Sequence, residues 1–134
     1  MGFLQRKVMP MRTVLLVEDS KLLRVNREHI LKQAGYLVLT AVDGVEALIL
    51  AYESHPDLIL LDLMLPKLDG AAVLRTLKAD PVTARIPVVI VTALSEKNEE
   101  KLMQEGAAAF VEKGLLLTTD EPLLYTIEKV LNAI

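Results

Sequence analysis

The chain has 134 residues, 52% of them hydrophobic, which suits one globular domain with its own buried core. Its formal net charge of −3 excludes a general attraction to nucleic acid or to an anionic membrane surface, and the lack of cysteine excludes disulfides and thiolate metal sites. No apolar run approaches the roughly 18 residues of a membrane span and the opening segment lacks a secretory signal, so we expect a cytoplasmic protein.

Five short aliphatic runs alternate with helical patterns along the chain. Several runs are apolar at every position, which is typical of strands covered on both faces of a sheet. The predicted strands are residues 13–17, 36–40, 57–61, 87–91 and 108–111. This alternation predicts an α/β fold, a (βα)5 doubly wound five-stranded parallel sheet with helices on both faces. We expect this domain to span residues 12–134, with residues 1–11 as an N-terminal extension.

Helix start and stop signals lie between the predicted strands. Glu46 follows Asp43 by three residues and would complete a capping box, and the last helix should begin near residues 118–120. The glycines expected directly after helices are Gly35 and Gly106. The N-cap residues expected for the first four helices are Ser20, Asp43, Asp69 and Ser95.

Polar residues follow four of the predicted strands. Glu18 and Asp19 come after the first strand, Asp62 after the third, Thr92 after the fourth and Lys113 after the fifth. Ligands of open parallel sheets bind beyond the carboxyl ends of the strands, where the strand order reverses. In the order 2-1-3-4-5 these four strands are neighbours, so we expect three carboxylates, a hydroxyl and an ammonium group in one cleft.

A divalent cation would balance the charge of this cleft, because three neighbouring carboxylates raise one another's pKa unless a cation compensates. Mg²⁺ prefers oxygen ligands and usually takes one or two carboxylates together with phosphate oxygens, whereas the spacing of histidine and cysteine for zinc is missing. Asp62 could then attack phosphorus and form an acyl phosphate. Lys113 would neutralise the phosphoryl oxygens and Thr92 would hydrogen-bond them.

The segments that hold these residues resemble a known family. "VLLVEDS", "DLILLDLMLPKLDG", "PVVIVTA" and "GAAAFVEKG" are similar, in order and spacing, to the motifs of response-regulator receiver domains, over about residues 12–133. The resemblance implies the flavodoxin-like receiver fold and assigns Asp62 as the phosphoacceptor. It further implies that Glu18, Asp19, Asp62 and the backbone carbonyl of Met64 hold Mg²⁺, with Asp19 the more direct ligand of the acidic pair.

The resemblance also implies a switch and its partners. Thr92 and Phe110 are the expected switch pair, which changes the face built from the fourth helix, fifth strand and fifth helix. The phosphoryl group would come from a sensor histidine kinase or a histidine phosphotransfer protein, with the receiver catalysing its own Mg²⁺-dependent phosphorylation and dephosphorylation. The output would be a downstream protein target, and the switching face could also form a homodimer. Since no effector domain follows, we expect a stand-alone receiver or a phosphorelay intermediate.

Two departures from the family pattern affect these expectations. Gly114 stands where the family usually has proline after the lysine, so we expect a trans Lys113–Gly114 peptide and a different path for this loop. Met64 and Leu94, the residues that flank the acceptor pocket, are apolar and cannot orient an attacking water. We therefore expect slow hydrolysis of the acyl phosphate.

Other functions fit the same residues less well. A flavodoxin-like cofactor binder needs an anion-accepting loop after the first strand, where this chain has "VEDSKLL", and a haloacid-dehalogenase-type phosphatase needs a second acid where Met64 stands. The main alternative is a pseudo-receiver, which uses the same fold as a phosphorylation-independent protein-interaction module. His29 and His55 lack partners at ligand spacing and are expected at the surface.

Overall fold

The computed structural model describes residues 11–93, 96–113 and 120–133, with the side chains of 96–98 left out. Within these ranges the chain forms β1 (Thr13–Val17), α1 (Lys21–Gln33), β2 (Leu37–Ala41), α2 (Gly44–Ser54), β3 (Leu58–Asp62), α3 (Gly70–Ala79), β4 (Val88–Thr92), α4 (Glu96–Gln104), β5 (Ala109–Glu112) and α5 (Glu121–Asn132). All four strand pairings are parallel and the sheet order is β2-β1-β3-β4-β5, so the predicted fold is confirmed.

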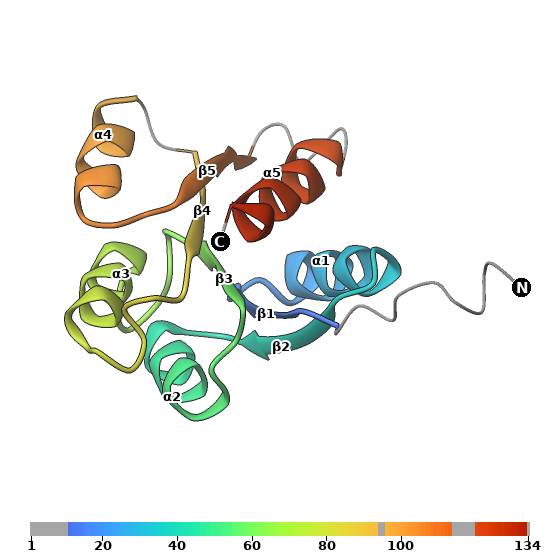
Figure 1. Ribbon diagram of the computed structural model, residues 1–134, viewed down its shortest axis with the longest axis horizontal. Coiled ribbons are helices and arrows are strands. Elements are labelled where there is room, and N and C mark those ends of the chain that lie inside the picture. Colours follow the sequence, from blue (N-terminus) through green and yellow to red (C-terminus); the bar gives the residue numbers. More distant parts are fainter. Residues whose placement is uncertain (1–10, 94–95, 114–119, 134) are drawn as a thin grey trace, which may run out of the picture.

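The sheet is the middle of three layers. The helices α1 and α5 cover one face, and α2, α3 and α4 cover the other (Figure 1). Alternate residues of β1 belong to different cores: Leu15 and Val17 pack toward α2 and α3, and Val14 and Leu16 pack toward α1 and α5. The central strands are therefore buried on both faces, which is why their sequences are apolar throughout.

Strand boundaries differ slightly from the sequence prediction. The first strand has the predicted bounds, whereas each of the other four begins and ends one residue later than predicted. The ladder continues past the apolar run, because the amide of Leu63 still donates to the carbonyl of Val91 at 3.2 Å. As a correction, Asp62 and Thr92 are the last residues of their strands rather than the first residues after them.

The predicted helix caps are largely confirmed. The side chains of Ser20, Asp43 and Asp69 each accept a hydrogen bond from the amide three residues on, and α5 begins directly after the predicted window, with Asp120 at its N-cap. Gly35 and Gly106 follow α1 and α4 with φ of 99° and 110°, a left-handed backbone that favours glycine. Ser95 and residues 1–10 lie outside the described residues.

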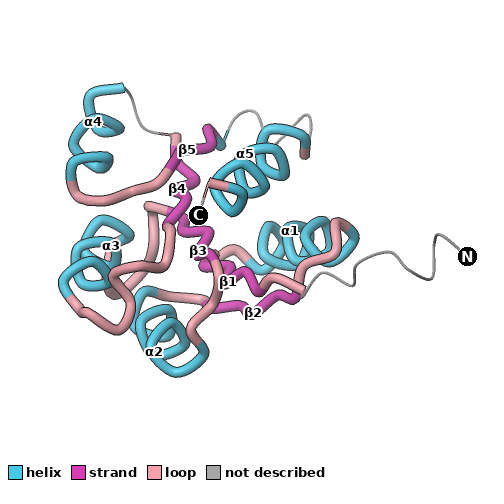
Figure 2. Tube along the Cα trace, viewed as in Figure 1, coloured by secondary structure: helices cyan, strands magenta, loops and turns pink. Residues whose placement is uncertain are grey.

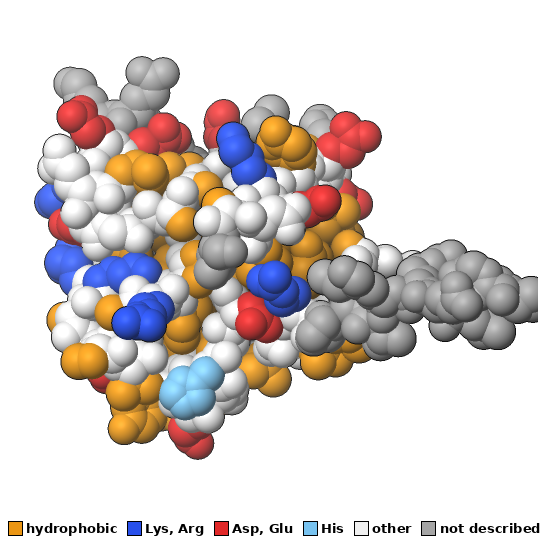
Figure 3. Space-filling model, in the orientation of Figure 1, with side chains coloured by type: hydrophobic (Ala, Val, Ile, Leu, Met, Phe, Trp, Pro, Cys, Tyr) orange, Lys and Arg blue, Asp and Glu red, His pale blue; other side chains and the backbone are white. Residues whose placement is uncertain are grey.

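The helices, strands and loops of the described ranges are shown along the same trace in Figure 2. In those ranges no helix combines the length and the apolar composition that a membrane crossing requires. On the face drawn in Figure 3, basic side chains gather over α3 while acidic side chains are scattered around them.

Candidate functional site

The polar residues predicted at the strand ends lie at the carboxyl edge of four adjacent strands. Glu18 and Asp19 directly follow β1, Asp62 and Thr92 end β3 and β4, and Lys113 directly follows β5. One carboxylate oxygen from each of Glu18, Asp19 and Asp62 lies within 4.8 Å of the other two, and we call these three residues the acidic cluster. The Nζ atom of Lys113 lies 2.9 Å from Oδ2 of Asp62. The structure thus brings three carboxylates and one ammonium group together.

Asp62 is held in a fixed orientation by its neighbours. Its side chain is only 1% exposed, and its Oδ1 accepts a hydrogen bond of 3.0 Å from the amide of Met64. Oδ2 is buried and faces the ammonium of Lys113, but no donor among the described residues forms a well-directed hydrogen bond with it. A buried carboxylate oxygen with spare acceptor capacity can bind a cation or act as a nucleophile.

Glu18 is also buried, and both of its oxygens have donors. Oε1 pairs with the guanidinium of Arg27 at 2.5 Å, and Oε2 accepts from the amide of Ser20 at 3.1 Å. Burial raises the pKa of Glu18 to about 7 and the nearby Asp62 carboxylate adds to this rise, whereas the Ser20 amide and the Arg27 charge oppose it. The two acids of the VED segment therefore differ, since Glu18 is enclosed and Asp19 is exposed to solvent.

The donor set of the acidic cluster fits a hard divalent cation. It consists of carboxylate oxygens, one of them the buried Oδ2 of Asp62, and the cluster has no imidazole or thiol. Mg²⁺ takes such ligands in small number and keeps waters for its other positions. The exposed side chain of Asp19 is open to such an ion, whereas Glu18 is already engaged by Arg27 and Ser20.

The expected switch residues lie on neighbouring strands. Thr92 is buried at the end of β4, and Phe110 on β5 is half-buried against the core under α2, α3 and α4. Phe110 pairs with Ile90 in the β4–β5 register, so its side chain points to the same face of the sheet as Thr92. Met64 is 68% exposed, and Leu94 and Gly114 lie outside the described residues.

The loop after β3 is fastened to α2 by contacts that the sequence did not reveal. Lys67, in the left-handed region at φ 66°, forms an ion pair of 3.2 Å with Asp43, the N-cap of α2. A Cβ added to Gly44 would lie 2.5 Å from the carbonyl oxygen of Leu68, so the start of α2 packs directly on this loop. The loop that follows β3 is thus held to the start of α2 both by an ion pair and by direct packing.

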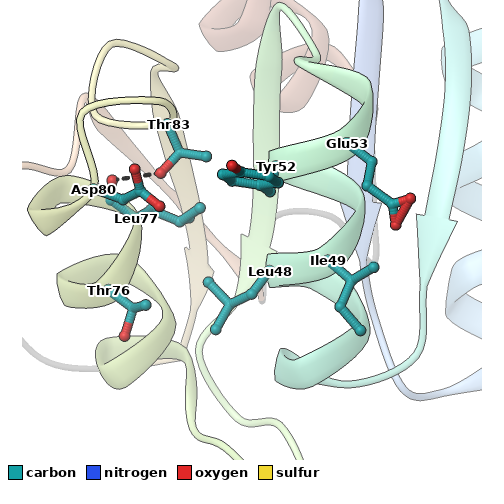
Figure 4. A pocket seen from close by; sticks show the side chains of 8 residues that line it. All are labelled: Leu48, Ile49, Tyr52, Glu53, Thr76, Leu77, Asp80 and Thr83. Carbon is teal, nitrogen blue, oxygen red and sulfur yellow. Dashed lines mark hydrogen bonds between the residues drawn. The ribbon is translucent and has the colours of Figure 1, made fainter.

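A hollow lies between α2 and α3, away from the acidic cluster. It is bounded by the carboxyl-terminal halves of both helices, at the opposite edge of the sheet, and Figure 4 shows Tyr52 lying between them while Glu53 points away. The hydroxyl of Thr83 donates to the carbonyl of Leu77 at 2.7 Å. The lining residues are Leu48, Ile49, Tyr52, Glu53, Thr76, Leu77, Asp80 and Thr83. Because none of Glu18, Asp19 and Asp62 lines it, this hollow is separate from the acidic cluster.

Comparison with known sequences agrees with the geometry of the site. A family model described as "Response regulator receiver domain" matches residues 14–120. The polar-differentiation response regulator DivK of Brucella ovis is 40% identical over 105 residues, which are 78% of this chain and 85% of DivK.

Two solved structures have the same fold. The chemotaxis protein CheY4 of Vibrio cholerae superimposes with a TM-score of 0.82 at 30% identity, over 90% of this chain and 99% of that one. The receiver domain of sensor histidine kinase PA1611 from Pseudomonas aeruginosa, described with a magnesium ion coordinated in the active site cleft, gives a TM-score of 0.81 at 27% identity, over 92% and 99%.

Proposed function

The chain belongs to the response-regulator receiver domains of two-component signalling, and on that premise we propose that Asp62 is its phosphoacceptor. Receiver domains are phosphorylation-dependent switches that bind Mg²⁺ at an acidic site and interact with histidine kinases and downstream targets. The observation that supports Asp62 is its buried carboxylate, which lies in the acidic cluster and 2.9 Å from the ammonium of Lys113.

In the proposed reaction, Asp62 attacks the phosphorus of a phosphohistidine on the partner protein. A carboxylate oxygen forms the new P–O bond, the P–N bond breaks, and the released imidazole takes a proton from solvent. The amide of Met64 keeps the carboxylate oriented during this transfer. Lys113 neutralises charge on the phosphoryl oxygens, and Thr92 donates its hydroxyl to one of them.

Mg²⁺ would be held directly by Asp19, Asp62 and the Met64 carbonyl, while Glu18, the fourth residue of the predicted set, would contribute its charge beside the ion. When bound, it supplies positive charge that stabilises the phosphoryl oxygens as the bond to phosphorus forms. Without such a cation, the acidic cluster would repel an incoming phosphoryl group. Phosphorylation by this route is therefore expected to require the metal.

The output is proposed to be a change of the face formed by α4, β5 and α5. Thr92 and Phe110 lie on neighbouring strands below this face, so movement of the Thr92 hydroxyl toward a phosphoryl group would leave space for the ring of Phe110. We propose that the downstream target binds this face and that a homodimer forms through it. We further propose that the protein does not contact nucleic acid directly. Light scattering before and after phosphorylation tests the homodimer.

Intact mass after incubation with acetyl phosphate tests the acceptor assignment. We expect a single phosphoryl adduct on the parent protein that requires Mg²⁺ and is lost in Asp62→Asn. The matched control is Asp69→Asn, which makes the same chemical change in the loop after β3 at the N-cap of α3, where asparagine also caps well. Absence of an adduct on the folded parent in Mg²⁺ would instead indicate a pseudo-receiver.

A further inference from the structure

Arg27 is a charged side chain on the core-facing side of α1. Its side chain is 6% exposed, and Leu31, one turn further along the helix, is fully buried. Arginine is almost never buried without a partner, because removing its charge from water is strongly unfavourable. The partner here is Glu18 of the acidic cluster, at 2.5 Å.

This ion pair changes what the acidic cluster can offer to a cation. Glu18 has its Oε1 bound to Arg27 and its Oε2 bound to the amide of Ser20, so its carboxylate is turned toward the start of α1. The cluster is therefore flanked by two cations, Arg27 on the side of α1 and Lys113 on the side of β5. Two of the three carboxylates are thus ion-paired before any metal binds, but of these two only Glu18 has a hydrogen-bond donor on both of its oxygens.

We propose that Arg27 is a positioning residue that holds the Glu18 carboxylate away from direct coordination and thereby lowers the affinity of the site for Mg²⁺. The inference rests on the proposed function, since it concerns the same metal site. In the metal-free protein the Arg27 guanidinium balances the negative charge of Glu18, so the electrostatic attraction of Glu18 for a divalent cation is weaker. Asp19 and Asp62 are left as the direct carboxylate ligands.

A second arginine of α1 provides a matched control. Arg24 donates to the backbone carbonyls of Glu18 and Asp19, at 3.0 and 3.2 Å, and so brings a positive charge to the same turn through backbone contacts. Loss of Arg24 removes one positive charge near the cluster but leaves the Glu18 ion pair in place. Comparison of Arg24→Met with Arg27→Met therefore separates the effect of breaking the Glu18 ion pair from the effect of losing a nearby positive charge.

Calorimetric titration with Mg²⁺ alone, at pH 8, tests the proposal on the parent, Arg27→Met, Arg27→Lys, Arg24→Met and Glu18→Gln. Without Arg27 the Glu18 carboxylate is free to turn to the metal, and one more unit charge at several Å from the ion, at an effective dielectric constant of about 20, changes affinity by about tenfold or more, so we expect Arg27→Met to bind Mg²⁺ about tenfold more tightly. Arg27→Lys should restore the parental affinity, and Arg24→Met should have a smaller effect. In the double variant with Glu18→Gln, Arg27→Met should give no gain over Glu18→Gln alone.

The amide resonance of Ser20 gives an independent readout, because this amide donates to Glu18 in the parent. We expect Mg²⁺ to shift it further in Arg27→Met than in the parent, as Glu18 turns to the metal. Equal affinity in the parent and Arg27→Met, or an equal gain in Arg24→Met, overturns the inference while the proposed function stands. If neither the parent nor Arg27→Met binds Mg²⁺, both fail. Where Arg27→Met does not fold, Arg27→Gln, which removes the charge but keeps a hydrogen-bond donor for Glu18, replaces it with the same expected gain.

Discussion

Gly70, the first residue of α3, packs directly on the end of β3, the strand that ends with Asp62. A Cβ added there would lie 2.6 Å from Cα of Leu63, 2.8 Å from the carbonyl oxygen of Asp62 and 2.9 Å from that of Leu63. Ordinary contacts of this kind begin at 3.4 Å, so the closest pair must separate by about 0.8 Å. All three contacts are backbone atoms, which cannot rotate away. Gly70→Ala is therefore expected to displace the backbone that bears Asp62.

The expected cost can be worked out from opposing terms. Overpacking costs about 1–3 kcal/mol, and three fixed backbone contacts put Gly70→Ala in the upper part of that range, about 2–3 kcal/mol. Alanine regains up to about 1 kcal/mol through its higher helix propensity, so the free energy of unfolding should fall by about 1–2 kcal/mol. A catalytic group misplaced by about 1 Å can lose about 100-fold in rate, so phosphorylation by acetyl phosphate should slow by about 10–100-fold. Urea unfolding gives the first quantity, and a time course of intact mass gives the second.

Gly35→Ala is the matched control for this experiment. Gly35 has φ of 99°, and a Cβ added there would have no atom within 4 Å, so alanine costs about 1–2 kcal/mol of backbone strain without touching the site. It should lose stability as Gly70→Ala does, yet keep the parental phosphorylation rate. A Gly70→Ala variant with parental stability, or with the parental rate, would refute the reasoning.

Three further predictions concern other parts of the molecule. Burial raises the pKa of Glu18 from 4.5 to about 7, so the folded state favours the protonated form of this side chain. The stabilisation from that preference is complete below pH 4.5 and is lost as the pH rises to 7. At 1.36 kcal/mol per pH unit, the free energy of unfolding of the metal-free protein falls by about 3 kcal/mol through this group. Urea midpoints should show this fall in the parent but not in Glu18→Gln. Lys78→Met leaves the carbonyls of Ala84 and Ile86 without the ammonium that donates to them at 3.0 and 2.8 Å, so we expect a loss of about 1–3 kcal/mol with an unchanged phosphorylation rate, which urea unfolding and intact mass check. Met64→Asn places a polar group beside Asp62 that can orient water, so decay of the phosphoryl adduct should accelerate; an unchanged lifetime would contradict the proposed role of the apolar residue.

The fold and the meeting of the acidic residues could be predicted from the sequence because both follow from periodicity. Continuous apolar runs such as "LILL" identify buried parallel strands, and the order of the sheet then brings Asp62 and Asp19 to the same edge. The strand bounds were shifted by one residue, since a ladder ends where backbone pairing ends and not where apolarity does. The fastening of the loop after β3 was missed because Lys67 and Asp43 are distant in sequence and meet only when α2 and α3 are packed.

The ion pair of Arg27 and Glu18 had a signal in the sequence, but an incomplete one. Leu23, Arg27 and Leu31 are spaced four residues apart, so Arg27 stands on the apolar stripe of α1, where a charge needs a partner. Nothing in that spacing says which acid pairs with it. Glu18 and Asp19 are adjacent in the turn after β1, and only the packing of α1 on the sheet determines that Glu18 is the enclosed one. The same packing leaves Asp19 open to solvent, so one structural cause gives two neighbouring acids different environments.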